Sequence, residues 1–185
     1  VLIRGEAAKP DYKVEPSVPS VFKMKITEPV PTGHSSGRRL ALANWIANPS
    51  NPLTSRVMVN RIWQYHFGKG IVGSPNDFGQ AGEPVSNLKL LDWLATEFVS
   101  SGWSVKHMHR IIMNSKTYQR SSKSNPNNMT KDPSNIHHWR MNLRRLEAET
   151  LRDKILQVSG LLNKKRGGPS FYPALSGEVL SGASK

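Results

Sequence analysis

Residues 54–79 read TSRVMVNRIWQYHFGKGIVGSPNDFG, and the rest of the chain is organised around this stretch. In its first part, apolar side chains recur on two faces of a helix-like period, which is typical of a helix at the centre of a fold. We expect this helix over residues 53–67. A run of glycines follows, and it predicts an ordered loop because apolar residues are placed between the glycines. The stretch therefore predicts a central helix joined to a glycine-rich loop.

Polar residues in this stretch are placed among aromatic ones. Arg56 and Asn60 are four residues apart, and they fall on an apolar side of the expected helix. A partly buried arginine needs a carboxylate partner, because an unpaired buried charge is strongly destabilising. The available partners are Asp77, Asp92, Glu97, Glu147, Glu149 and Asp153, and we expect Asn60 as well to meet carboxylates from the loop or the later helices. An internal ion pair is favoured over a ligand-binding arginine.

We group the residues expected to form these polar contacts as a candidate polar cluster. Its members are Arg56, Asn60, Arg61, Trp63, Asp77, Asp92, Arg145, Glu149, Arg152 and Asp153. Arg145, Glu149 and Arg152 have the spacing of an ion-pair row on one helix face. Asp77 is expected to cap a turn or to pair with an arginine. The pattern identifies no catalytic residue and no reaction.

Periodicity and capping residues predict four further helices. They are expected at about 37–47, at 87–101, from 105 onwards and at about 144–162. The expected capping residues, in chain order, are Ser35 or Ser36, Asn51 for the central helix, Ser86 and Ser104. Residues 121–135 are polar and contain prolines, which predicts a loop. The expected fold is therefore mainly α, a single domain of about five helices.

The N-terminal part of the chain has a different composition. Val1–Arg4 is a short strand candidate, and five prolines then interrupt residues 5–36. Because proline fixes its own backbone and disfavours helix in the residue before it, we expect an extended arm over residues 1–36. The helical domain is expected over 37–172, and residues 173–185 form a tail.

The composition excludes several classes of site. The 185 residues contain no cysteine, so this stretch can form no disulfide, thiolate metal site or covalent c-type haem. No apolar run approaches the ~18 residues of a membrane helix, and no signal peptide is visible. His107 and His109 diverge by about 200° on a helix, which disfavours a shared metal. We expect no metal and no cofactor in this chain, and we expect the chain to be a piece of a longer protein.

The net charge of +13 is concentrated in the second part of the chain. Residues 103–185 carry fifteen Lys or Arg against five Asp or Glu. The polyanion-binding candidates are Lys106, Arg110, Lys116 and Arg120. Such a basic face attracts polyanions such as nucleic acid, anionic lipid or a sulfated glycan. A solvated basic face that keeps the domain soluble is the favoured interpretation.

Several separated blocks resemble the planctomycete-specific domain of unknown function 1553. They are GRRLALANWIANPSNPLTSRVMVNRIWQYHFGKGIVGSPNDFG at 37–79, LLDWLATEFVSSGW at 90–103, RRLEAETLRDKILQVSG at 144–160 and GGPS at 167–170. The family usually has a His-Pro-Glu-like start before LLDWL, whereas this chain has Asn87-Leu88-Lys89. A role for that histidine therefore does not transfer.

The resemblance implies a context rather than an activity. Members of the family form the C-terminal part of large exported proteins, which often carry a cytochrome c-like module. It implies a localisation that is exported, periplasmic or in the cell envelope, and it places any haem in a separate module of the parent protein. The family has no established activity that could be transferred.

Two hypotheses about function follow. The first is a non-catalytic helical interaction or structural module, whose partners are other domains of the parent protein or envelope proteins. The alternative is a binding or hydrolytic domain for an anionic glycan, for example a sulfated one, with Arg56, Asn60, Arg61 and Asp77 at the site and the basic C-terminal half attracting the ligand. Nucleic-acid binding is disfavoured, because the aromatic residues lie on apolar helical faces instead of alternating with basic residues.

Overall fold

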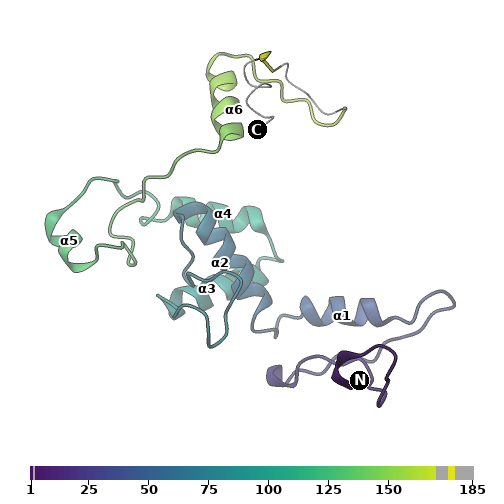
Figure 1. Cartoon of the computed structure of the whole chain (residues 1–185). Helices are drawn as coiled ribbons and strands as arrows, with labels where there is room; N and C mark the ends of the chain where they lie inside the picture. The colour runs from purple at the N-terminus through teal and green to yellow at the C-terminus, as the bar shows by residue number, and fades with distance from the viewer. Residues whose placement is uncertain (2, 170–174, 178–185) are drawn as a thin grey trace. The chain divides into compact units, whose positions relative to one another are not determined.

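The protein is all-helical in the residues that the computed structural model describes, which are 1, 3–169 and 175–177 (Figure 1). Along the chain lie α1 (Arg38–Ile46), α2 (Thr54–Phe67), α3 (Leu88–Ser100), α4 (Val105–Asn114), α5 (Pro126–Lys131) and α6 (Ala148–Val158). Short 3-10 turns at Ile3–Gly5 and Ser20–Phe22 precede them. The described residues contain no strand, and five of the six helices have seven residues or more. The predicted mainly α fold is confirmed.

Contacts divide the chain into two compact units, Val1–Arg144 and Arg145–Lys185, and each unit is described by itself. The first unit contains α1 to α5, and the second contains α6. The expected domain boundaries, with an arm over 1–36, a helical domain over 37–172 and a tail over 173–185, stay a prediction. Most of the tail lies outside the described residues.

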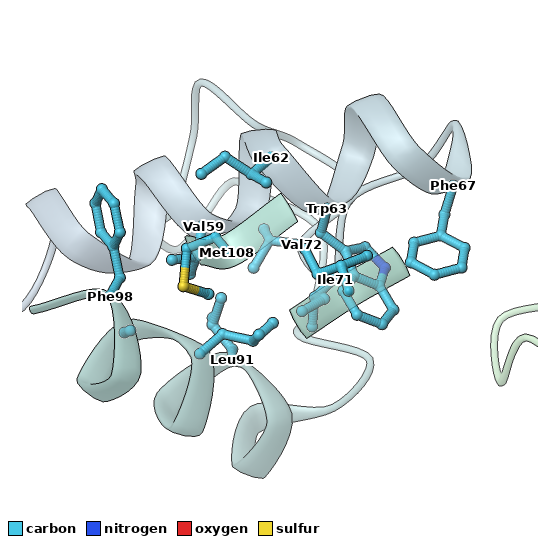
Figure 2. Packing of buried hydrophobic residues seen from close by; sticks show 12 residues of the cluster. Val59, Ile62, Trp63, Phe67, Ile71, Val72, Leu91, Phe98 and Met108 are labelled. Atoms are coloured by element: carbon cyan, nitrogen blue, oxygen red, sulfur yellow. The ribbon is translucent and has the colours of Figure 1, made fainter. Parts of the chain in front are cut away.

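The hydrophobic core lies in the first unit, where α2 packs against α3 and α4 and these two pack against each other. Its buried side chains are Val59, Ile62, Trp63, Phe67, Ile71, Val72, Leu91, Leu94, Ala95, Phe98, Met108 and Ile112. Figure 2 shows Val59 and Met108 meeting above Leu91 between the helices. Four core residues come from α2 and two from the loop after it, so the stretch that decides the fold also supplies half of the core.

The glycine-rich loop is fixed to α2 by a buried amide. The side chain of Asn60 accepts a hydrogen bond from the Val72 N–H (2.9 Å) and donates one to the Val72 carbonyl (3.0 Å). This pairing satisfies a buried backbone donor and a buried acceptor, which would otherwise be destabilising. At Gly70 an added Cβ would lie 2.7 Å from the Asn60 amide nitrogen, so only glycine lets the loop approach so closely. As a result Ile71 and Val72 enter the core.

Some of the capping predictions are confirmed and others are wrong. Ser104 caps α4 by accepting a hydrogen bond from the His107 N–H (3.3 Å). The expectation that Asn51 caps α2 is wrong, because Leu53 occupies the N-cap position without a side-chain cap, while Asn51 accepts hydrogen bonds from the N–H groups of Leu53 and Thr54 in the turn before the helix. Asn87, not Ser86, caps α3, because the Ser86 hydroxyl instead donates to the Ile71 carbonyl (2.8 Å).

The start of α1 also differs from the prediction. Gly37 occupies the N-cap position with φ 72°, and no side chain caps the helix, so the expectation for Ser35 or Ser36 is wrong. The backbone of Val30 lies so close to Gly37 that an added Cβ would collide with it. Close approach of the arm, rather than capping, therefore selects the residue at this position.

Three secondary-structure predictions are corrected. The expected strand at the N-terminus is a 3-10 turn, Ile3–Gly5, in which Arg4 has the left-handed φ of 52°. The loop predicted over 121–135 contains the short helix α5, capped by Asn125. The last helix is shorter at both ends than the expected 144–162, since it runs only from Ala148 to Val158.

The arm contacts α1 in the first unit. The ring of Phe22 meets Trp45 edge-on, with centroids 5.6 Å apart, and Arg38 lies 3.7 Å from the carboxylate of Glu15. Only Ala41 of α1 is buried. The arm is therefore a surface segment that carries no part of the main core.

No helix in the described part of the chain is both long and apolar enough to cross a membrane. The second unit contains a single described helix, α6, with no buried residue.

Candidate functional site

Arg56 forms an ion pair with Asp92, which is one of the carboxylates expected from the sequence as possible partners. Its Nε lies 2.7 Å from Oδ1 of Asp92 on α3, and its Nη1 donates to the Pro52 carbonyl (2.7 Å). The two side chains are 32% and 43% exposed, so the pair is only partly desolvated. It borders an open cleft of about 520 Å³ that neither Trp63 nor Asp77 lines. The contact links two helices, as expected of an internal ion pair.

The other polar residues of the central stretch bind the neighbouring chain rather than a common centre. Asn60 is fully buried and pairs with the backbone of Val72 instead of a carboxylate. Arg61 donates to the side chain of Asn76 (3.0 Å) at the surface. The Asp77 carboxylate accepts from the Gly79 N–H (2.8 Å), which is the turn cap that was one of its two expected roles.

Trp63 contacts a residue that the sequence did not suggest. Its indole N–H donates to Nε2 of His138, 3.2 Å away, and the His138 ring lies 4.8 Å from that of Phe67. Since an indole can only donate, Nε2 carries no proton and the neutral ring carries it on Nδ1. Nδ1 is buried and has no partner in the structure.

The electrostatics of His138 agree with a neutral ring. Burial lowers its pKa, and the positive charges of Arg120 and His137 act in the same direction while Asp132 opposes them. The sequence carried no signal for this contact. Its two partners are 75 residues apart, and His138 has a left-handed φ of 50° that places the ring against α2.

A second histidine contact joins α2 to α4. His66 and His109 approach with 2.8 Å between ring nitrogens, and Tyr118 meets the His66 ring edge-on. Burial lowers the pKa of His66, and the charges of His109 and Arg144 lower it further. The helical spacing predicts that His107 and His109 point in different directions, and Nε2 of His107 lies 2.8 Å from Oε1 of Glu97. In the described residues no three His, Asp or Glu side chains gather in a way that could hold a metal ion.

The remaining members of the predicted polar cluster lie in the second unit. These are Arg145, Glu149, Arg152 and Asp153. All four are exposed, and Arg152 lies 3.9 Å from the carboxylate of Asp153. Because they belong to a different compact unit from Arg56, their expected grouping with Arg56 stays a prediction.

The polyanion-binding candidates divide into two groups. Lys106 and Arg110 are exposed on α4, whereas Lys116 and Arg120 lie beyond its end at Asn114. Arg120 donates to the His138 carbonyl (3.0 Å), so it has a structural contact. No ion pair found in the described part of the chain involves Lys106, Arg110 or Lys116.

The polar residues of the central stretch bind backbone groups, a turn or a neighbouring helix. A search of curated proteins and a search of solved structures each found no significant match. A family profile described as "PSD1: Protein of unknown function (DUF1553)" matches residues 38–184, starting at the first residue of α1. The chain therefore belongs to the DUF1553 family of proteins of unknown function.

Proposed function

We propose that this chain is a non-catalytic interaction module of a larger exported or cell-envelope protein. The observation that carries the proposal is the apolar stripe of α6. Leu151, Ile155 and Val158 recur on one helix face, and they are 49%, 61% and 91% exposed. Such a stripe is the sequence pattern of a helix that packs against another surface.

Two physical arguments support a partner for α6. An isolated helix of 11 residues is marginal in water, because nucleation is costly and stability comes mostly from packing. Each fully buried Leu, Ile or Val side chain contributes about 1.5–3 kcal/mol relative to its exposed state. Burial of the stripe against another part of the parent protein would therefore stabilise both the helix and the complex.

The first helix supports the same function. On α1, Leu40 is 65% exposed, and Leu42 and Ile46 are also exposed. Leu42 and Ile46 are four residues apart and share one face of α1, whereas Leu40 lies on another face. Exposed apolar surface can mark interaction sites in soluble proteins. The polar residues of α2, by contrast, are occupied by contacts within the first unit, which favours a structural over a catalytic role for them.

The cellular context of the proposal comes from the family resemblance. We expect the parent protein to be exported or held in the cell envelope, and we place any haem in a separate cytochrome c-like module. Partners would then be the other domains of the parent or neighbouring envelope proteins.

The experiment uses the full chain and the separately purified remaining segments of its parent protein. Binding is measured by calorimetry for the unchanged chain, for Ile155→Asp and for the control Gln157→Asp on a different face of α6. We expect Ile155→Asp to weaken binding about tenfold or more, because a buried contact residue is charged, and Gln157→Asp to leave it unchanged. No binding by the unchanged chain, or equal loss in both variants, would overturn the proposal.

A second candidate is binding or hydrolysis of an anionic, sulfated glycan. It is favoured by the exposure of Lys106, Arg110 and Lys116, which lack acidic partners in the described residues. A sulfated-glycan array read at low and high salt tests it, since contacts between exposed charges are screened at high ionic strength. Absence of binding at low salt would remove this candidate.

A further inference from the structure

The first unit contains a cavity of about 190 Å³ between the glycine-rich loop and residues 134–142. Its walls include Ile71, Pro84 and Val85 on one side and Ile136 and His138 on the other. Apolar cavities of about 150 Å³ in engineered proteins remain dry and take up benzene. The volume is therefore sufficient for one six-membered ring with a substituent.

Hydrogen bonds to the core hold both walls. The backbone N–H and the hydroxyl of Ser86 both donate to the Ile71 carbonyl, at 2.9 and 2.8 Å. On the opposite side, Asn142 donates to the Phe67 carbonyl (3.1 Å) and accepts from the buried Asn135 (2.9 Å). These hydrogen bonds fix both walls to the core, as in small-molecule sites, which are usually largely preformed.

Polar groups are placed at one part of the lining. Lys69 and Glu83 form an ion pair of 2.8 Å, and both line the cavity while remaining more than half exposed. Gly73 lies beneath the pair, where an added Cβ would collide with the Glu83 carboxylate. A charged donor and a charged acceptor therefore stand at the solvent side of a largely apolar space.

His138 keeps the opposite wall uncharged. Its Nε2 is occupied by Trp63, and burial lowers its pKa, so the ring is neutral near pH 7. A largely apolar pocket that also contains a few polar groups and a titrating residue with a shifted pKa is a general mark of a ligand site. Neither the polar cluster nor the interaction surface of α6 includes this pocket.

We infer that this cavity binds a small single-ring compound carrying one polar substituent, with the ring between Ile71 and Ile136 and the substituent at the Lys69–Glu83 pair. Phenol is the simplest molecule of this class. Its ring buries apolar surface, and its hydroxyl both donates to Glu83 and accepts from Lys69. The occupant is a free small molecule, and not the tyrosine side chain of a partner protein, because the space accommodates the ring but little of a flanking backbone.

The test titrates the full chain with phenol and follows backbone amide signals by NMR. We expect saturable shifts confined to residues 69–73, 83–86 and 134–142. Val85→Trp fills the cavity from its half-exposed edge, and we expect it to weaken phenol binding at least tenfold. The matched control Val105→Trp lies on α4 outside the cavity and is similarly exposed, so phenol should bind it unchanged.

Three outcomes would overturn the inference. The first is the absence of saturable shifts in the named segments, and the second is equal binding by Val85→Trp and the unchanged chain. The third is tighter binding of N-acetyltyrosine amide than of phenol, which would assign the pocket to a partner's side chain. Amide spectra of both variants that match the unchanged chain away from the substitution show that the fold is retained.

Discussion

The helices α2 and α6 carry the same kind of apolar repeat but differ in what covers it. On α2 the repeat is buried by α3, α4 and the glycine-rich loop within the first unit. On α6 the stripe stays exposed within the second unit. Periodicity thus indicates which face of a helix is apolar enough to be buried. The surface that covers this face is supplied by residues far away in the chain or by another molecule. The following predictions test this contrast, from the largest effect to the smallest.

The largest effect is expected from truncation of a core side chain. Phe67 is 1% exposed, so Phe67→Ala should lower the free energy of unfolding by about 3–5 kcal/mol through lost burial and a new cavity. Leu151→Ala on α6 should change it by less than about 0.5 kcal/mol, as surface substitutions usually do. Urea denaturation of both variants measures the difference. A comparable loss in Leu151→Ala would mean that α6 is covered within the chain.

The next effect concerns the amide that fixes the glycine-rich loop. Asn60→Ala leaves the N–H and the carbonyl of Val72 without their partner, and each buried unpaired group costs about 1–3 kcal/mol. Denaturant unfolding should show this loss, whereas Asn76→Ala at the surface should show almost none. An unchanged midpoint in Asn60→Ala would contradict the assignment of Asn60 as the fixing residue.

A smaller effect is expected from the Arg56–Asp92 pair. Because both side chains are partly exposed, Asp92→Asn should cost about 0.5–1 kcal/mol, in the range of surface ion pairs. A double-mutant cycle with Arg56→Gln isolates the coupling between the two residues. A coupling of several kcal/mol would instead show that the pair is desolvated. The cleft beside Arg56 and Asp92 would then be a candidate binding site again.

The last prediction concerns pH. The folded-state pKa values of His66 and His138 are lowered, so below about pH 6.5 the unfolded state binds more protons. The first unit should therefore lose stability as the pH falls from 7.5 toward 5.5. His66→Gln with His138→Gln should reduce this dependence, measured as the shift of the urea midpoint with pH. The second unit contains no histidine, so any effect of histidine titration arises in the first unit. A pH dependence that persists unchanged in the double variant would contradict the assignment to His66 and His138.

Local patterns were sufficient to predict part of this molecule. The position of α2 and the cap at Ser104 follow from spacing, and the high cost of a buried unpaired charge predicts a carboxylate partner for Arg56, although six candidates stayed open until the structure showed Asp92. Asn60 was placed correctly on α2, but its partner was not, because backbone groups of a loop compete with carboxylates for a buried amide.

The features that sequence reasoning missed depend on distant contacts or unusual backbone. The Trp63–His138 contact spans 75 residues, and the ring reaches α2 only because His138 has a left-handed backbone conformation. The cavity arises from two loops that the sequence indicated only as polar or glycine-rich. Neither could be inferred from periodicity, which records only local repeats.

The pairing of Asn60 with Val72 has a consequence for hydrogen exchange. The Val72 N–H belongs to a loop, where amides usually exchange readily, yet its acceptor is a side chain on the central turn of α2. This amide can exchange only when the loop leaves α2 or when α2 itself opens. If the loop separates only with the core, the Val72 amide will exchange as slowly as those of α2. One loop proton would then report the global opening of the first unit.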